Sequence, residues 1–364
     1  MSSGVWARPN TMKAVVLRGA KALVERDRPL PRLRDDYVLV KTEAVALNPT
    51  DWKHVNGGLG AEGGLVGCDF SGVVKEIGRA VTKSWKVGDH ICGVAHGSNK
   101  YQPEDGAFAE YIVAKGDIQM RIPEHMTFAQ AATIGLGATT VGQGLYQQAL
   151  HLPLPPQAPR QRHDNKNVLI YGGSTATGAL GIQYARLSGF SVYTTCSPKN
   201  FDYVKSLGAI EAFDYNDEIS ISRLRDQTKD NELRLAWDTI GTPASAEFCM
   251  KSLSTRSDCK YGCISYPPVP ISRADVKNVG TLMYSVFGEP FEKRGNNFPA
   301  SPEDFAFTKR FMAITEELLA QGQLRPHAAL VGKDGLEGVL KGMKDMKDGK
   351  VSGQKLVYLV ADTP

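Results

Sequence analysis

The sequence predicts an α/β protein with a β-rich part and a doubly wound parallel sheet. In the first 130 residues, short alternating runs are separated by Gly, Pro or Asp, which is typical of a barrel-like or partly open β domain. From residue 168 onward, apolar runs alternate with helix-like stretches, as in a doubly wound sheet. The 364 residues, 42% of them hydrophobic, suffice for two cores.

The first part is expected to contain several strands and then one long helix. Thr127 is a suitable N-cap for a helix that runs to about Leu150. The proline-rich segment from His151 to Asn167 is expected to be a surface loop. The strands are expected at Met12–Arg18, Tyr37–Leu47, Phe70–Ile77, His90–Ala95 and Phe108–Val113.

The second part is expected to alternate strands with helices. Strands are expected at Val168–Tyr171, Ser191–Cys196, Ala209–Phe213, Leu233–Thr239 and Tyr261–Ser265, with a further one at Gly280–Phe287. Helices are expected at Ala176–Ser188, Phe201–Ser206, Ile219–Thr228 and Ala244–Leu253. The C-terminal elements, expected to complete the first part, are a helix at Glu303–Ala320, strands at His327–Val331 and Lys355–Val360, and a helix at Gly335–Met346.

A glycine-rich turn follows the buried strand that ends at Tyr171. Gly172, Gly173 and Gly178 punctuate this turn, and a helix is expected directly after it. Such a turn lets backbone N–H groups and the positive helix end approach a phosphate, so it is the expected cradle of a dinucleotide pyrophosphate. The spelling departs from Gly-x-Gly-x-x-Gly because Thr175 stands midway between Gly172 and Gly178. Taken alone, this glycine spacing would also fit any tight turn between a strand and a helix.

The next strand indicates which nucleotide the turn would hold. An NAD site normally has a carboxylate there for the ribose 2′-hydroxyl, but no Asp or Glu lies between Asp164 and Asp202. Ser197 and Lys199 stand there instead, and they suit a 2′-phosphate. The residues therefore favour NADPH over NADH.

The net charge, the apolar runs and the cysteines limit the classes of function that this sequence can have. A net charge of +4 does not require a nucleic-acid partner, no apolar run approaches a membrane span, and the N-terminus lacks the apolar core of a secretory signal. The six cysteines form no Cys-x-x-Cys pair, and reduced thiols in a cytoplasmic protein account for them best.

Several motifs together resemble the medium-chain dehydrogenase/reductase superfamily, over nearly the whole chain. A subset is similar to the fungal trans-acting enoyl reductases that serve iterative polyketide synthases. The broader resemblance is carried by Asn48–Lys53, Gly67–Val74, Val87–Ile91 and the turn after Tyr171, and the narrower one by Tyr171–Gly178, Thr195–Asn200, Phe213–Tyr215 and Val286–Glu289.

This resemblance implies a GroES-like substrate domain interrupted by a Rossmann domain, with the active cleft between them. The expected boundaries are 1–130 for the substrate domain, 131–302 for the NADP-binding domain and 303–364 for the return to the first. It also implies NADPH-dependent reduction of an α,β-unsaturated thioester carried by the acyl carrier protein of a partner polyketide synthase.

The resemblance raises the question of a metal. Zinc-dependent relatives place a Cys where Asn48 stands and a Gly-His-Glu where Gly67–Asp69 stands, and they carry a four-cysteine lobe that is missing around Cys92–Tyr111. Cys68 and Asp69 could supply two ligands, but a buried thiol and a capping carboxylate explain them better. No metal is expected.

Residue-by-residue carry-over from the resemblance gives the site residues. Lys53 is the candidate catalytic residue, a cation near the enolate or cofactor, although a solvated loop lysine explains it equally well. The expected cofactor contacts are Asn48, Pro49, Thr50, Asp51, Ser174, Thr175, Ala176, Thr177, Ser197, Pro198, Lys199, Asn200, Tyr215, Ser265, Tyr266, Val351 and Ser352. The expected substrate contacts are Gly135, Leu136, Gly137, Ala138, Thr139, Thr140, Val141, Gly142, Ser285, Val286, Phe287, Gly288 and Glu289.

The same residues are also compatible with other roles, and the sequence with other functions. Small residues from Gly135 to Gly142 would equally serve close helix packing, and Tyr215 would also fit as a core aromatic. Pro267, Pro268 and Pro270 disfavour edge-strand pairing, so a monomer is expected. Rival functions are a stand-alone NADPH reductase of quinones or enones, a cofactor-binding assembly partner without turnover, and a non-reductive step such as cyclisation.

Overall fold

The computed structural model describes residues 6–155, 166–229, 232–256 and 258–364, and the chain divides into two compact units. The first unit comprises Met1–Leu136, Tyr284–Ala320 and Pro326–Pro364, and the second comprises Gly137–Met283 and Gln321–Arg325. These limits differ from the expected ones at residues 130 and 302. The chain rejoins the first unit at Tyr284, because Tyr284, Phe287 and Phe291 all pack against the His96 ring of that unit.

The first unit is built on a seven-stranded sheet. Six strands follow the order β16-β17-β3-β4-β5-β7, and β6 pairs with β3. The C-terminal strands thus complete the sheet begun by the N-terminal ones, as expected. The strands are β3 (Tyr37–Ala46), β4 (Asp69–Ile77), β5 (His90–Val94), β6 (Tyr111–Lys115), β7 (Met120–Arg121), β16 (Ala329–Gly332) and β17 (Lys355–Leu359).

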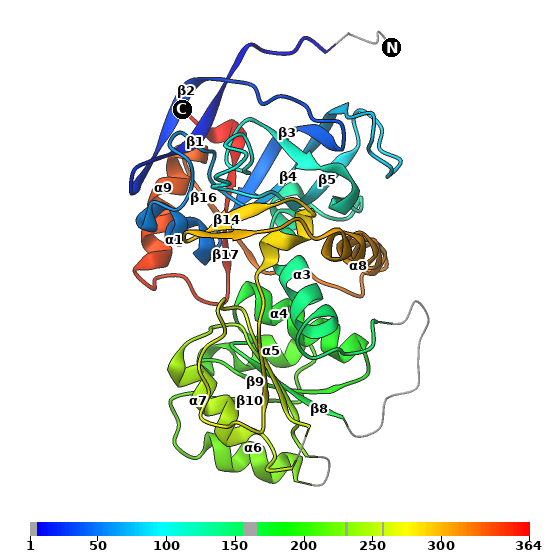
Figure 1. Cartoon of the computed structure of the whole chain (residues 1–364), viewed down its shortest axis with the longest axis vertical. Helices are drawn as coiled ribbons and strands as arrows, with labels where there is room; N and C mark the ends of the chain where they lie inside the picture. The colour runs from blue at the N-terminus through cyan, green and yellow to red at the C-terminus, as the bar shows by residue number, and fades with distance from the viewer. Residues whose placement is uncertain (1–5, 156–165, 230–231, 257) are drawn as a thin grey trace. The chain divides into compact units, whose positions relative to one another are not determined.

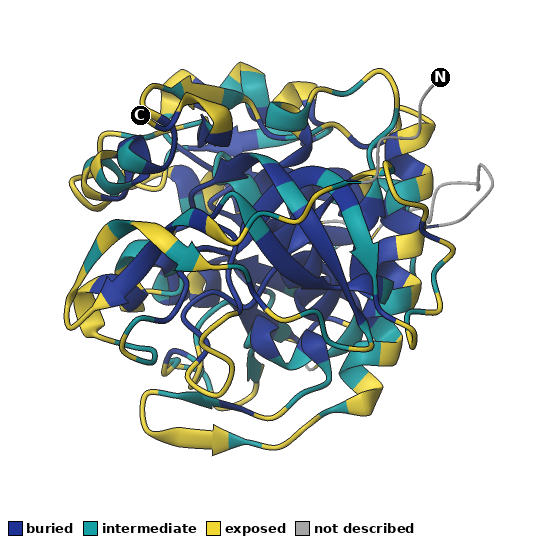
Figure 2. Cartoon of the chain, turned by 90° about the horizontal axis from the view of Figure 1, so that it is seen from above, coloured by how far each residue is buried: buried dark blue, intermediate teal, exposed yellow. Residues whose placement is uncertain are grey.

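Two antiparallel hairpins and four helices accompany this sheet (Figure 1). Phe70 and Phe108 are fully buried in the core of the unit. In Figure 2, buried residues follow the strands in the middle of the view, whereas exposed residues gather on the outer sides of helices, on loops and on strands at the edge. The hairpins are β1 (Thr11–Arg18) with β2 (Lys21–Pro29) and β14 (Phe291–Lys293) with β15 (Asn296–Phe298), and the helices are α1 (Pro49–Gly57), α2 (Phe128–Ala131), α8 (Pro302–Ala320) and α9 (Gly335–Lys347).

The second unit is a six-stranded parallel sheet in the order β10-β9-β8-β11-β12-β13. The order reverses at β8, and right-handed crossovers then place helices on both faces, so the sheet is doubly wound as expected. The strands are β8 (Asn167–Tyr171), β9 (Ser191–Thr195), β10 (Glu211–Phe213), β11 (Leu235–Asp238), β12 (Lys260–Cys263) and β13 (Lys277–Gly280), and the helices are α4 (Ala176–Leu187), α5 (Phe201–Ser206), α6 (Ser220–Thr228) and α7 (Pro243–Ser252).

The expected long helix from Thr127 to Leu150 is interrupted. Thr127 does cap α2, through a capping box with Gln130, but the helix stops after one turn. The Thr133 hydroxyl then donates to the Gln130 carbonyl, and Gly135 packs so closely on β5 that an added Cβ would lie 2.1 Å from the Gly93 oxygen. The chain resumes as α3 (Gly135–Val141) and continues into a wider helical turn at Gly142–Gln147.

Three other expectations are corrected. The expected strand Phe108–Val113 lies later, as β6, and Gly280–Phe287 is the end of β13 followed by a 3₁₀ turn, η4 (Met283–Phe287). The polar strand β2 was not expected, because it pairs only with β1 and half of its residues remain exposed. The 156–165 part of the expected proline-rich loop lies outside the described residues.

Candidate active site

The glycine turn of the second unit joins β8 tightly to α4. Gly172 has φ +82°, a conformation that favours glycine. An added Cβ on Gly173 would lie 2.0 Å from the Thr194 hydroxyl oxygen, and one on Gly178 would lie 2.2 Å from the Gly172 oxygen. Gly173 is therefore required by a close side chain, Gly178 by close backbone, and Gly172 by its backbone dihedral.

The start of α4 presents amide groups that can bind an anion. Thr175 is the N-cap, and its hydroxyl accepts from the Gly178 N–H at 2.9 Å. No acceptor is recorded among the described residues for the N–H groups of Ser174, Ala176 and Thr177. Unpaired amides at the positive end of a twelve-residue helix suit a phosphate, so the turn fits the pyrophosphate of a dinucleotide.

The residues expected near a 2′-phosphate lie at the carboxyl ends of β9 and β10. The hydroxyls of Ser197 and Tyr215 are 3.1 Å apart, and 42% of Tyr215 is exposed. Pro198 and Lys199 are exposed, whereas Asn200 is buried. The nearby Asp214 carboxylate accepts from the Asn216 N–H and so closes its own turn. The structure thus brings Ser197 and Tyr215 together, and Tyr215 is not a core residue.

Of the other expected cofactor residues, two lie in the second unit and the rest lie in the first. Ser265 and Tyr266 follow β12 in the second unit, where Tyr266 is 48% exposed. Val351 and Ser352 precede β17 in the first unit, the unit that also holds Asn48 to Asp51 at the start of α1.

A buried ammonium group organises the first unit beside α1. Lys355 Nζ donates to Asn48 Oδ1 at 2.9 Å and to the Thr133 carbonyl at 3.3 Å, and it forms an ion pair with Asp69. Only 2% of the Lys355 side chain and none of the Asp69 side chain is exposed. Because each charge has its opposite beside it, the pair is tolerated in the interior.

The remaining donors complete this cluster. Asn48 Nδ2 donates to Asp69 at 2.9 Å, and the Leu136 N–H donates to the other Asp69 oxygen at 2.6 Å. Asn48 also caps α1 in a capping box with Asp51. Burial raises the pKa of Asp51 to about 7, and the nearby Asp69 charge acts in the same direction.

These residues do not fit a zinc ion. Asn48, Cys68 and Asp69 stand where zinc-dependent relatives place their ligands, but Asn48 offers only an amide and Asp69 is already paired with Lys355. Burial raises the pKa of the Cys68 thiol, which disfavours the thiolate that zinc binds. Among the described residues, no group of three or more His, Cys, Asp or Glu side chains has a metal-binding arrangement.

Lys53 lies on α1, not on a loop, and its side chain is partly exposed to solvent. Its ammonium is 5.7 Å from the centre of the Trp52 ring. Partial burial and the neighbouring Arg294 lower its pKa. No carboxylate partner is recorded for it among the described residues, so it is available to an anionic group.

The expected substrate residues are mostly buried. Gly135 to Gly142 form α3 and the residue after it, and Thr139 is only 2% exposed. Ser285 to Gly288 complete η4 and its end. Glu289 is held by the Tyr37 hydroxyl at 2.9 Å and by Lys115 Nζ at 2.7 Å, so its carboxylate has a structural role in the first unit.

Sequence reasoning missed the polar residues that surround α1. His54, Tyr284, Lys293 and Lys355 were not among the candidates, yet all four contact expected site residues or their immediate neighbours. Two signals were present. Thr50 and His54 are four residues apart, which places them on one helix face, and Lys355 is a charged residue at the start of an apolar strand.

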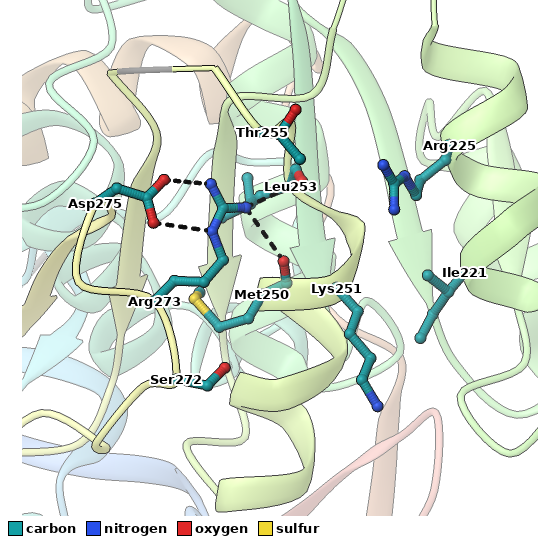
Figure 3. Close-up of a pocket in the computed structure, with 9 residues that line it drawn as sticks. All are labelled: Ile221, Arg225, Met250, Lys251, Leu253, Thr255, Ser272, Arg273 and Asp275. Atoms are coloured by element: carbon teal, nitrogen blue, oxygen red, sulfur yellow. Dashed lines mark hydrogen bonds and ion pairs between the residues drawn. The ribbon is translucent and has the colours of Figure 1, made fainter.

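A pocket of about 610 Å³ in the second unit does not belong to this site (Figure 3). It is lined by the first turns of α6, by the end of α7 and by the segments that precede β12 and β13, whereas the glycine turn follows the carboxyl end of β8. Arg273 pairs there with Asp275 and donates to the Met250 and Leu253 carbonyls. The charged groups of Arg273 and Asp275 are therefore satisfied by each other and by the backbone.

Comparison with known proteins decides the family. The model of the alcohol dehydrogenase GroES-like domain matches residues 34–124, and that of the zinc-binding dehydrogenase matches residues 176–290. The trans-enoyl reductase resD of Aspergillus sclerotiorum is 45% identical over 355 residues, which cover 94% of this chain and 98% of that protein. This chain belongs to the trans-enoyl reductase family. The trans-enoyl reductase ACTTS2 of Alternaria alternata is 40% identical, with 96% and 99% covered.

Solved structures agree on the fold. An alcohol dehydrogenase superfamily protein from Novosphingobium aromaticivorans superposes with a TM-score of 0.75 at 21% identity, over 96% of this chain and 100% of that one. The CurK enoyl reductase gives 0.71 at 17% identity, over 96% and 99%. The expected fold class and superfamily are confirmed. This trans-enoyl reductase is an oxidoreductase of the CH–CH class that takes a nicotinamide cofactor.

Two further expectations concern the pairing of the cysteines and the presence of a membrane-spanning segment. All six cysteines are buried and unpaired, as expected. Within the described part of the chain, no helix combines the length and apolarity needed to cross a bilayer.

Replacing Lys355 by Met is expected to destabilise the protein strongly, because it leaves the Asp69 carboxylate buried without its cation. The free energy of unfolding should fall by about 3–5 kcal/mol, measured by urea denaturation. The exposed Lys350, which pairs with Asp345 and Asp348 on the surface, provides the control, and Lys350→Met should change the stability little. Equal stabilities for the two variants would show that the buried ammonium is dispensable.

Proposed function

We propose that this trans-enoyl reductase uses NADPH to reduce an α,β-unsaturated polyketide thioester that the acyl carrier protein of a partner polyketide synthase presents. The identity of 45% to a trans-enoyl reductase, over nearly the full length of both chains, carries this proposal. The trans-enoyl reductases TOXD of Cochliobolus carbonum and ACTTS2 of Alternaria alternata support it, at 47% and 40% identity.

The choice of NADPH rests on the side chains after β9. Lys199 is exposed and carries a positive charge, and the Ser197 and Tyr215 hydroxyls lie beside each other at the same strand ends. In the proposal, Lys199 and Ser197 hold the 2′-phosphate, Tyr215 stacks on the adenine, and the amides of Ser174 to Thr177 hold the pyrophosphate. Asn200, Ser265 and Tyr266 are assigned to the same nucleotide.

NADPH, when bound, supplies the hydride that adds to Cβ of the thioester. The chain must then stabilise the negative charge that gathers on the thioester oxygen and protonate Cα. Lys53 is assigned to the thioester oxygen, because its ammonium has no recorded carboxylate partner among the described residues. Asn48 to Asp51 position the nicotinamide end, and Val351 and Ser352 contribute backbone contacts from the segment before β17.

The acyl chain is assigned to two segments of small and apolar residues. These segments are Gly135 to Gly142 and Ser285 to Glu289. Val286 and Phe287 are buried, so they set the shape of the second segment more than its polarity. This assignment predicts that substrate selection depends on size and branching of the acyl chain.

A stand-alone reductase of quinones or enones would use the same nucleotide, so the substrate must separate the two functions. NADPH consumption with a panel of enoyl-pantetheine thioesters, with and without α-methyl groups, should exceed consumption with simple quinones at matched concentrations. Faster reduction of quinones would favour the stand-alone reductase. NADPH binding without turnover on any thioester would favour an assembly partner.

Lys199→Ala is expected to weaken NADPH binding by roughly tenfold or more and to leave NADH binding nearly unchanged, because only NADPH carries the 2′-phosphate that Lys199 would pair with. Dissociation constants from fluorescence titration measure both. Lys205, exposed on α5 and paired with Glu211, provides a matched lysine whose removal should affect neither nucleotide. Equal losses of NADPH and NADH binding would refute the assignment of the 2′-phosphate.

A further inference from the structure

Four polar side chains of the first unit, those of Lys293, His54, Thr50 and Tyr284, form a continuous hydrogen-bonded series near the buried ammonium of Lys355. Lys293 Nζ contacts His54 Nε2, His54 Nδ1 lies 3.0 Å from the Thr50 hydroxyl oxygen, and that oxygen lies 2.8 Å from the Tyr284 hydroxyl. The four residues come from the β14–β15 hairpin, α1 and η4. The proposed function uses neither His54, Tyr284 nor Lys293, although the reaction needs a proton donor.

The hydrogen bonds fix which ring nitrogen of His54 carries its proton. His54 Nδ1 lies 2.7 Å from the Thr50 backbone carbonyl, which can only accept, so Nδ1 must be the donor. Nε2 is then free to accept from the Lys293 ammonium. Burial and the nearby Lys293 charge lower the pKa of His54 to about 3, so the ring is neutral near pH 7. A neutral ring with one donor and one acceptor can pass a proton from one side to the other.

The two ends of this hydrogen-bonded series, Lys293 and Tyr284, differ in their exposure to water. Lys293 is partly exposed, so it can exchange protons with water. Tyr284 is 3% exposed, and its ring stacks on His96 with centroids 4.5 Å apart. Its hydroxyl also reaches the Cys68 thiol, which is a weak acceptor. Its proton is therefore not committed to a strong acceptor, and Tyr284 immediately precedes Ser285 to Glu289, the segment assigned to the acyl chain.

We propose that Tyr284 protonates Cα of the enolate and that Thr50, His54 and Lys293 form the relay that replaces its proton. This inference rests on the proposed function, because the hydride transfer creates the enolate. The Tyr284 O–H bond breaks as the Cα–H bond forms from the enolate electron pair. A proton then moves from Thr50 to Tyr284, from His54 Nδ1 to Thr50, and from Lys293 to His54 Nε2. The neutral Lys293 amine then takes a proton from water. His54, left with its proton on Nε2, returns to its resting form by losing the Nε2 proton and taking one on Nδ1 through exchange with water.

The relay predicts a specific pH dependence. Burial lowers the pKa of Lys293 to about 8, so the ammonium form is present below that pH and is lost above it. The rate should therefore fall as the pH rises through about 8. The titratable or charged groups that face Lys293 are Glu292 and Arg294 on its own hairpin, Asp51 and His54 on α1, Cys68 before β4, His96, and Tyr284, whose ring centre lies 4.5 Å from Lys293 Nζ.

The kinetic test compares Tyr284→Phe and Lys293→Met with matched controls. Tyr284→Phe should lower kcat roughly 10²-fold, leave the KM for the enoyl thioester within about twofold, and enlarge the solvent isotope effect. Lys293→Met should lower kcat and abolish the decline above pH 8. Tyr101→Phe removes a hydroxyl that bonds to Asn297 on the same hairpin, and Lys344→Met removes a surface lysine paired with Asp348; both should behave like the wild type.

The outcomes separate the relay from the proposed function. If the wild type reduces no enoyl thioester, the proposed function fails. If it does reduce one, and Tyr284→Phe keeps the wild-type kcat and pH profile, the relay is wrong and the proposed function stands.

A second measurement does not depend on turnover or on the folding of a variant. ¹⁵N NMR of the His54 ring in the full-length wild-type protein should show a neutral ring protonated at Nδ1 from pH 6 to pH 9. Its Nε2 resonance should shift with a midpoint near pH 8, when Lys293 loses its proton. A ring protonated at Nε2, or an Nε2 resonance that does not respond near pH 8, would overturn the proposal.

Discussion

The first unit depends on one ammonium group that is held in its interior. Lys355 reaches Asp69 at the start of β4, Asn48 at the start of α1 and the Thr133 carbonyl ahead of α3. These segments are far apart in the sequence, and a buried charge must have its partners to be tolerated. The cluster therefore fixes the start of α1, and with it Thr50, Asp51 and His54. The side chains of the proposed relay and of the proposed nicotinamide contacts on α1 are therefore positioned by this ion pair.

In the second unit, the groups suited to bind the pyrophosphate are backbone amides instead of side chains. Its glycines allow the turn after β8 to press against β9 and the start of α4, and three amides remain without a recorded acceptor among the described residues. Binding of a phosphate by such amides needs no titratable group, so it is insensitive to pH near neutrality. In the proposed relay, the proton chemistry belongs to the first unit, where a buried histidine, a threonine, a tyrosine and a lysine lie within hydrogen-bonding distance of one another.

The sequence was most informative where local patterns determine the structure. The strand, glycine turn and helix from Asn167 to Leu187 have strong local signals, and the structure has them where the sequence predicts them. Lys355 and Lys293 could not be predicted in the same way, because their partners lie more than 200 residues away along the chain. The break after α2 was missed for a similar reason, since it depends on the contact between Gly135 and β5. Family resemblance supplied the expected contacts, but not the ion pairs that hold them in place.

The central claim is that a fixed ammonium group, and not a metal ion, organises the site at which this trans-enoyl reductase acts. The most direct test is the metal content of the purified protein, measured by inductively coupled plasma mass spectrometry before and after dialysis against a chelator, with reductase activity followed in parallel. Well under one zinc per chain and unchanged activity after chelation are expected. One full equivalent of zinc whose removal abolishes activity would contradict it.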